Sequence, residues 1–317
     1  MKFPLFPTQA SSVAQQIDYL YWALVGVSAA MLLIIFLPMI FFLFKYRRGK
    51  QADRSPAHLP QTTLEVTWTV IPLLLMMGMF AWGANLYFTV ERPPPGALEI
   101  NVVGKQWMWK IQHPEGNREI NELHVPVGRI IKLTLASQDV IHSLFLPNFR
   151  IKQDVVPGRY TTEWFTANRV GAFYLFCSEF CGTQHSGMRG RVVVMEPAAY
   201  EQWLINGQPG STLVQSGERL YRELGCSGCH TGNSVVRAPP LEGVFGKPVP
   251  LQSGEVVVAD EGYLRDSIIF PNKQIVGGYA TNMPSFQGRV TEEEVFQLVA
   301  YIKALGKKSP PPPPGTR

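Results

Sequence analysis

Two long runs without a formal charge constrain the fold of this chain more than any other feature. They cover residues 20–44 and 66–90. Each run has about 25 residues, which is enough to cross a bilayer as a helix. Pro38 and Pro72 interrupt the runs, and membrane helices tolerate such interruptions. Buried helices of a large soluble core are the alternative, but runs of this length disfavour it. We predict a transmembrane hairpin within residues 1–96.

Basic side chains gather in the short loop between the two runs: Lys45, Arg47, Arg48, Lys50 and Arg54. Short basic loops stay on the cytoplasmic side of a membrane. We therefore expect both termini, and everything after about Glu91, on the extracytoplasmic side. The first 16 residues carry one charge, Lys2, and lack an apolar core with a small-residue cleavage site. We expect no removed signal peptide before the first helix.

The length of the chain bears on its number of domains, and its net charge bears on the kind of partner it binds. A chain of 317 residues is expected to hold more than one domain. The net charge of +5 partly reflects the basic loop. It does not indicate a nucleic-acid partner, because the soluble part has no basic stripe with interleaved aromatic residues. No catalytic triad, phosphate-binding loop or dinucleotide fingerprint has the context that such a motif needs.

Short strand-like segments separated by turns fill residues 97–200. Residues 98–103 are rich in β-branched side chains, and residues 130–136 alternate between apolar and polar positions. The segments 173–176 and 191–195 have the same character. Short strands with regular turns favour a sandwich or barrel, and we predict an all-β Greek-key sandwich.

Soft metal-binding side chains gather in one segment, which reads Cys177-Ser-Glu-Phe-Cys181-Gly-Thr-Gln-His185-Ser-Gly-Met188. Thiolate, imidazole and thioether groups select copper over magnesium or calcium. One imidazole from elsewhere, such as His142, would complete a set for two copper ions bridged by two sulfurs. A disulfide between Cys177 and Cys181, or buried cysteines beside unrelated residues, is the alternative. The ligand-like spacing of His185 and Met188 favours metal binding.

The composition changes after a linker at residues 201–212, and residues 213–306 are expected to be helical. This part contains Cys226-Ser-Gly-Cys229-His230, the C-x-x-C-H attachment motif of c-type haem. A thioredoxin-like pair would need a βαβ context, and a zinc knuckle would need two further ligands. Neither is present in the downstream sequence.

A haem that transfers electrons benefits from a sixth ligand, and methionine raises its potential. Met283 is the only methionine after Met195, so it is the thioether candidate. The last helix is predicted over residues 291–305 and begins with a capping-box pattern. Residues 307–317 form a proline-rich tail that we expect to be disordered.

The cysteine-rich segment resembles the CuA loop of subunit II of the haem-copper cytochrome c oxidases. Residues 18–200 resemble that subunit, and residues 213–306 resemble a fused class I cytochrome c. The resemblance implies a multidomain chain: a two-helix transmembrane hairpin, an all-β cupredoxin-like sandwich and an all-α cytochrome c domain.

The resemblance also implies the cofactors, a binuclear copper centre and a covalent haem c. The copper ligands would be His142, Cys177, the backbone carbonyl of Glu179, Cys181, His185 and Met188. The haem would be attached to Cys226 and Cys229, with His230 and Met283 as axial ligands. The Glu179 side chain matches a ligand of a magnesium ion at the interface with subunit I, a suitable role for a carboxylate.

Two further positions match functional positions of the family. Glu65 matches a carboxylate at the entrance of a proton path into subunit I, although a carboxylate at a helix N-terminus is also favoured by the helix dipole. Trp107 matches a tryptophan near CuA where electrons enter, whereas Trp109, in the same aromatic-rich strand-like stretch, is expected in the core. The remaining histidines are interpreted as structural, namely His58, His113 and His124.

The function implied is that of the electron-input subunit of a terminal oxidase. Electrons would pass from haem c to CuA and on to haem a of subunit I, where oxygen is reduced to water and protons are pumped. Other implied partners are subunit III, the lipid bilayer, and a donor that is a cytochrome, a copper protein or a neighbouring respiratory complex. The implied location is the cytoplasmic membrane of a bacterium.

Two alternatives stay open at this point. The chain could be a membrane-anchored copper and haem electron shuttle without an oxidase partner. It could also be the CuA-containing input subunit of a nitric oxide reductase. The presence of every CuA ligand type argues against the quinol-oxidase branch.

Overall fold

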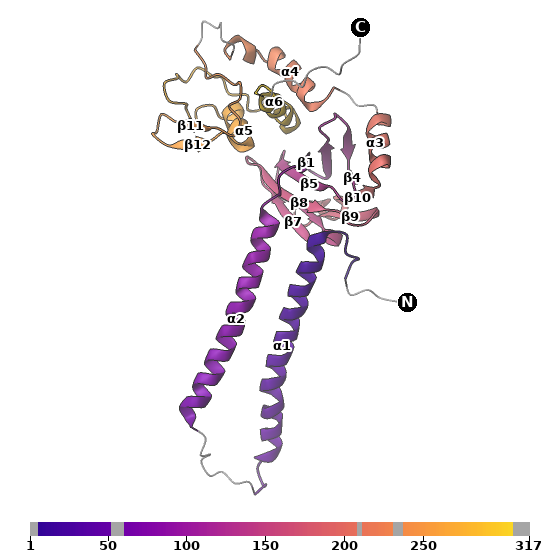
Figure 1. The fold of residues 1–317 in the computed structure, drawn as a ribbon, viewed down its shortest axis with the longest axis vertical. Coiled ribbons are helices and arrows are strands. Elements are labelled where there is room, and N and C mark those ends of the chain that lie inside the picture. The colour runs from indigo at the N-terminus through magenta and orange to yellow at the C-terminus, as the bar shows by residue number, and fades with distance from the viewer. Residues whose placement is uncertain (1–5, 52–59, 208–210, 231–236, 307–317) are drawn as a thin grey trace.

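The computed structural model describes residues 6–51, 60–207, 211–230 and 237–306. Two long helices carry a β-sandwich, and a helical domain lies against one face of that sandwich (Figure 1). This arrangement confirms the predicted fold class. Arg54, His58, part of the predicted linker and the proline-rich tail lie outside the described residues.

The two helices of the hairpin are α1 (Ser12–Lys45) and α2 (Gln61–Glu91). Both are long and apolar enough to cross a membrane. They extend beyond the charge-free runs of the sequence, because helical hydrogen bonds continue past the part that suits a bilayer. Ser11 caps α1, and its side chain accepts a hydrogen bond from the Ala14 backbone N–H.

The first turn of α1 is built into the sandwich. The Ser11 hydroxyl donates to the Phe149 carbonyl at 3.0 Å, and the Ala10 N–H donates to the carbonyl of Asn148 at 2.8 Å. Arg150 donates from Nε to Asp18 Oδ1 of α1 at 2.8 Å. The sandwich is therefore attached to the top of α1 by backbone and side-chain bonds.

The sandwich has two five-stranded sheets, with strand orders β3-β2-β1-β5-β8 and β4-β10-β9-β6-β7. The pairs β1/β5 and β4/β10 are parallel, and the other pairs are antiparallel. The strands are β1 (Leu98–Lys105), β2 (Met108–Gln112), β3 (Arg118–Ile120), β4 (Glu122–Pro126), β5 (Ile130–Ser137), β6 (His142–Leu146), β7 (Ile151–Val155), β8 (Thr161–Thr166), β9 (Gly171–Cys177) and β10 (Arg189–Met195). The short helix η1 (Pro147–Phe149) connects β6 to β7.

Alternating side chains fill the space between the two sheets. The apolar face predicted for β5 is confirmed, since Ile131, Leu133 and Leu135 are fully buried. Trp109 lies in β2 and is also fully buried, as predicted. Trp107 differs from the prediction, because it lies in the turn between β1 and β2 rather than in a strand.

A helix that the sequence did not predict covers one end of the sandwich. This helix, α3 (Pro197–Asn206), occupies the first half of the stretch interpreted as a linker. Its Trp203 ring stacks on His124 with centroids 4.6 Å apart, and Tyr200 is buried against the core. Because these contacts come from strands distant in the sequence, local composition could not show them.

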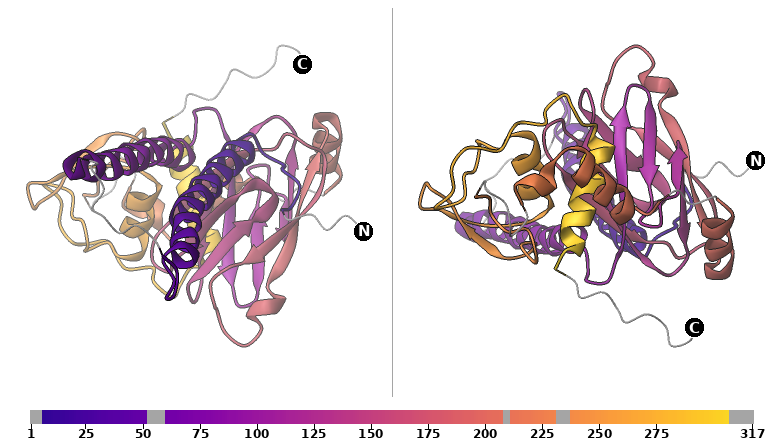
Figure 2. Two further views of the ribbon diagram at one scale, coloured as in Figure 1. Left: turned by 90° about the horizontal axis from the view of Figure 1, so that it is seen from below. Right: turned by 90° about the horizontal axis from the view of Figure 1, so that it is seen from above.

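The C-terminal domain contains three helices, α4 (Leu213–Glu223), α5 (Glu261–Ile269) and α6 (Glu292–Ala304). The predicted capping box of α6 is present. A short 3-10 helix, η3 (Cys226–Gly228), and a small pair of strands, β11 (Pro248–Pro250) and β12 (Val256–Val258), add to the predicted all-α domain. The helices α4 and α6 lie side by side (Figure 2).

Candidate functional site

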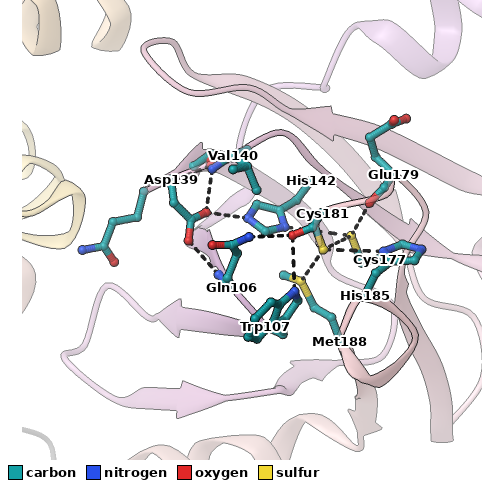
Figure 3. Close-up of polar contacts among 12 residues, drawn as sticks. Gln106, Trp107, Asp139, Val140, His142, Cys177, Glu179, Cys181, His185 and Met188 are labelled. Atoms are coloured by element: carbon teal, nitrogen blue, oxygen red, sulfur yellow. Dashed lines mark hydrogen bonds and ion pairs between the residues drawn. The ribbon is translucent and has the colours of Figure 1, made fainter. Parts of the chain in front are cut away.

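The predicted copper ligands come together at one end of the sandwich (Figure 3). His142 is the first residue of β6, and Cys177 is the last residue of the neighbouring strand β9. The loop between β9 and β10 supplies the other donors and contains the 3-10 helix η2 (His185–Gly187). Two adjacent strand ends and one loop thus place donors that are far apart in the sequence in one small volume.

The donor atoms converge on the two sulfurs. Cys177 Sγ lies 3.8 Å from Cys181 Sγ, 4.0 Å from His142 Nδ1 and 3.2 Å from the Glu179 carbonyl oxygen. Cys181 Sγ lies 3.5 Å from His185 Nδ1 and 3.7 Å from Met188 Sδ. A disulfide needs a separation of about 2.05 Å. Both thiols are free, and the donor set is soft, so these residues fit copper.

The two sulfurs are enclosed by protein, and the pKa values of the two thiols shift in opposite directions. Both cysteines, His142 and Met188 are buried, while His185 is half-buried. Burial alone would raise the pKa of Cys177, but hydrogen bonds with His142 and the backbone outweigh it and lower that pKa. Burial and the neighbouring Cys177 sulfur raise the pKa of Cys181. The pair therefore presents an anionic sulfur to a cation.

Asp139 positions the first imidazole, a role that the sequence reading did not assign. Its Oδ1 lies 2.8 Å from His142 Nε2, which leaves Nδ1 directed at Cys177. The carboxylate accepts hydrogen bonds from the backbone N–H groups of Gln106 at 2.8 Å and Val140 at 2.7 Å. Such a partner fixes the tautomer and orientation of a metal-ligating histidine. In the sequence, this role was indicated by the position of Asp139 three residues before His142.

Two side chains of the β1–β2 turn hold the copper loop. Gln106 Nε2 donates to the Cys181 carbonyl at 2.7 Å, and Trp107 Nε1 donates to the same oxygen at 3.3 Å. A Cβ atom at Gly182 would lie 2.9 Å from Gln106 Nε2, so a glycine permits this close approach. Trp107 is thus adjacent to the copper loop, as predicted.

Glu179 and Glu65 are not gathered into this centre. The Glu179 carbonyl faces the sulfurs, whereas its side chain is exposed and points away from them (Figure 3). Glu65 is exposed in the first turns of α2, at the end of the hairpin far from the sandwich (Figure 1). Both side chains are exposed in this structure.

The C-terminal domain encloses a cavity of about 360 Å³. Cys226, Cys229, His230 and Met283 all line it, and apolar residues form most of the remaining wall. The His230 Nδ1 atom lies 2.9 Å from the Pro239 carbonyl, which leaves Nε2 available to the cavity. Two free thiols, an oriented imidazole, a thioether and an apolar wall fit a covalently attached haem.

Two of the histidines interpreted as structural, His113 and His124, take part in a separate hydrogen-bond network. His113 is fully buried, and its Nε2 lies 2.7 Å from Glu119 Oε1. His124 Nδ1 contacts the other oxygen of the same carboxylate. Although Glu119, Glu122 and His124 could approach one ion, both Glu119 oxygens are already used by imidazoles. This network holds α3 on the sandwich.

Three family models match the chain in order. Residues 2–82 match the transmembrane domain of cytochrome c oxidase subunit II, and residues 117–196 match the periplasmic domain of the same subunit. Residues 214–306 match cytochrome c. The three matches follow the hairpin, the sandwich and the C-terminal domain.

Curated relatives carry the same family name. Cytochrome c oxidase subunit 2 of Alkalihalophilus pseudofirmus is 29% identical over 297 residues, covering 88% of this chain and 84% of the relative. The subunit 2 of Thermostichus vulcanus is also 29% identical, over 66% of this chain and 80% of the relative.

Solved structures include the periplasmic domain of subunit II of the cytochrome oxidase of Bradyrhizobium japonicum. It is 33% identical, with 37% of this chain and 97% of that chain covered and a TM-score of 0.36. A heme-copper terminal oxidase dimer is 20% identical, over 43% of this chain and 100% of that chain, with a TM-score of 0.35.

Proposed function

The chain belongs to the subunit II family of cytochrome c oxidases, with a cytochrome c domain at its C-terminal end, and from this premise we propose that it is the electron-input subunit of a haem-copper oxidase. The single observation that carries the proposal is the convergence of the soft donors around Cys177 and Cys181. This centre and the cytochrome cavity lie in one chain, which would provide two successive electron-transfer sites.

The copper residues have separate tasks. The thiolates of Cys177 and Cys181 and the imidazoles of His142 and His185 would hold two copper ions. Met188 and the Glu179 carbonyl would complete the set. When bound, the copper pair accepts and releases one electron. Asp139 holds the His142 ring, and burial of the sulfurs excludes water from the centre.

The cytochrome residues hold a haem in the cavity. Cys226 and Cys229 would attach it through thioether bonds, and His230 and Met283 would bind its iron. The Pro239 carbonyl fixes the His230 ring. A histidine and methionine pair raises the potential of a haem.

The partner proposals rest on the family and on exposed groups. Subunit I would carry haem a and the oxygen-reducing site, with the Glu179 carboxylate as a magnesium ligand at the shared interface. Glu65 would collect protons at the opposite membrane face. We also propose subunit III, and an external donor that is a cytochrome, a copper protein or a neighbouring complex. The basic loop supports placing both soluble domains outside the cytoplasmic membrane of a bacterium.

The two alternative functions are disfavoured. A simple electron shuttle would need only one membrane anchor, whereas this chain matches the subunit II family in its hairpin as well as in its sandwich. The relatives are cytochrome c oxidase subunits, which also disfavours an input subunit of a nitric oxide reductase.

The test is purification of the full chain from its membrane, followed by optical and electron paramagnetic resonance spectra. We expect a low-spin c-type haem, a mixed-valence two-copper signal and co-purification with a haem-a subunit that consumes oxygen. A stable lone chain without oxidase activity would support the shuttle instead. Turnover of nitric oxide but not oxygen would support the reductase.

A further inference from the structure

Helix α6 lies between the haem cavity and the sandwich. Leu298 and Ile302 line the cavity on one side of the helix. Phe296 lies on the other side, since two residues turn about 200° around a helix axis. This residue is 3% exposed, and its neighbours belong to the sandwich. One helix is therefore shared by the two domains.

The centre of the contact is apolar. Phe296 packs with Val103 of β1 and Ala136 of β5, both of which are buried. Its ring stacks on Tyr160, with centroids 4.7 Å apart and planes at 17°. The Tyr160 hydroxyl is buried and has no hydrogen-bond partner among the described residues. Because its hydroxyl makes no hydrogen bond there, Tyr160 contributes to the contact through the packing of its ring.

Ion pairs surround this apolar centre. Lys110 of β2 binds Glu293 of α6 at 2.6 Å, and Lys303 of α6 binds Glu99 of β1 at 2.8 Å. Arg265 of α5 donates to the Gly158 carbonyl of the sandwich at 2.9 Å. An apolar centre with a polar rim is the anatomy of a specific interface.

The apolar contact ends at a copper ligand. Val103 is followed in β1 by Gly104, which lies against the His142 ring. A Cβ atom at Gly104 would be 2.9 Å from His142 Cδ2 and 3.2 Å from its Cγ. Glycine is required here for the imidazole to pack directly on the backbone. Phe296 is thus linked to His142 through two consecutive residues of β1, Val103 and Gly104.

A polar chain runs beside the apolar one. Glu293 contacts Lys110, and Lys110 Nζ donates to Gln138 Oε1 at 3.3 Å. Gln138 is covalently followed by Asp139, whose carboxylate holds His142 at 2.8 Å. Both routes from α6 reach the copper site on the His142 side. Trp107 takes part in neither, since its indole N–H donates to the Cys181 carbonyl.

We propose that α6 docks the cytochrome domain on the sandwich in a fixed pose and couples it to the copper centre through His142, with Phe296 and Gln138 as the coupling residues. The proposal rests on the proposed function. The coupling carries one electron: a ferrous haem becomes ferric, the copper pair gains that electron, and no bond or proton changes partner. On the outer face of this sheet, α6 covers Val103 of β1 and Ala136 of β5.

Docking is tested by hydrogen exchange of the full chain, with or without metals. We expect Phe296→Ala to speed exchange of the interface amides in β1, β5 and the β7–β8 loop more than about tenfold, as loss of a buried aromatic contact should. Lys110 lies outside the cytochrome domain, and we expect Lys110→Met to speed exchange of the same amides by a smaller factor. Lys152→Met on the other sheet is the control. Unchanged exchange at these amides in both interface variants would overturn the docking.

Coupling is tested in the copper- and haem-loaded chain by the rate of electron transfer after photochemical reduction of the haem. We expect Phe296→Leu and Gln138→Leu to slow transfer several-fold while the copper spectrum stays unchanged. The control Glu201→Gln on α3 should transfer at the normal rate. Slowing by Trp107→Phe but by neither coupling variant would overturn the coupling. A chain that binds neither cofactor would instead refute the proposed function, and the exchange experiment would still decide the docking.

Discussion

Met188 and Met283 are the two thioethers that the structure directs into the two candidate cofactor sites. Met188 is 1% exposed and lies 3.7 Å from the Cys181 sulfur. Met283 lines the cavity that also holds His230. The two side chains belong to different domains, so changes at one should not reach the other.

Replacing each thioether should therefore alter one spectrum at a time. We expect Met188→Leu to change the copper resonance and lower copper retention, while the haem spectrum stays as it was. Met283→Leu should shift the haem away from its low-spin state and lower its potential, with the copper signal unchanged. Optical and paramagnetic resonance spectra of the full chain measure both.

Met195→Leu at the end of β10 is the matched control, because Met195 contacts the core and neither site. A normal low-spin haem with an unchanged potential in Met283→Leu would refute the axial assignment.

Sequence alone identified the donor set but not the residues that hold it. The ligand types and their spacing are local, so the short segment from Cys177 to Met188 already indicated copper. Gln106 became visible only when folding brought the β1–β2 turn beside the copper loop, whereas Asp139 lies three residues before the histidine that it holds. Contacts between strands that are distant in the chain leave no periodic signal.

At the scale of elements, α4 and α6 meet with almost no space between their backbones. A Cβ atom at Gly217 would lie 2.0 Å from the Gln297 carbonyl oxygen and 2.8 Å from Tyr301 Cβ. Backbone atoms cannot yield as a flexible side chain can. The close crossing of these helices therefore depends on a glycine at this position.

We predict that Gly217→Ala destabilises the cytochrome domain by roughly 1–3 kcal/mol or more, the usual cost of overpacking. Calorimetry of the full chain should show a lower unfolding temperature for this domain. Val214→Ala on the more exposed side of the same helix is the control and should have a small effect. Equal unfolding temperatures for Gly217→Ala and the unmodified chain would show that the two helices can move slightly apart without loss of stability.

The helix α3 can be tested by two truncations. A chain that ends at Gly207 keeps the stack of Trp203 on His124 and the contacts of Tyr200, whereas one that ends at Tyr200 loses Trp203. We expect the shorter chain to unfold at a lower temperature, because the buried His113–Glu119–His124 network loses its cover. Thermal unfolding followed by near-ultraviolet circular dichroism compares the two. Equal unfolding temperatures for the two chains would show that the part of α3 after Tyr200 does not stabilise the sandwich.

At the scale of the whole molecule, the fold class was predictable because each part has its own sequence pattern. Charge-free runs marked the hairpin, alternation marked the strands, and a cysteine motif marked the haem. The relative placement of the two soluble domains was not predictable. It depends on a few pairs such as Lys110–Glu293 and Lys303–Glu99, whose members are about 200 residues apart.

The pH dependence of domain docking follows from the Lys303–Glu99 pair. Burial raises the pKa of Glu99, but Lys303 and Lys132 outweigh it and lower that pKa. The stability that the Glu99 carboxylate contributes is fully present above the ordinary glutamate pKa of about 4.3, and it is lost as the pH falls through the lowered pKa. Burial lowers the pKa of Lys303, but Glu261 and Glu99 outweigh it and raise that pKa. The lysine contribution is lost only as the pH rises through this raised value.

We therefore predict that Glu99→Gln weakens docking most between about pH 6 and 9, and that the effect shrinks as the pH falls through the lowered pKa of Glu99. The loss should be at most about 1 kcal/mol, because Glu99 is half-exposed. Calorimetric unfolding of both chains across the pH range measures the difference, with Glu201→Gln as the charge-matched control. A difference that grows toward pH 3 would contradict the sign of this argument.

The burial of Ala10 and Ser11 against the sandwich has a consequence for biogenesis. Residues made before the first membrane helix are packed beside Phe149 and Ala167, which are made much later. The sandwich cannot finish folding until this N-terminal segment is on its own side of the hairpin. Once the sandwich closes around the segment, the first helix can no longer invert.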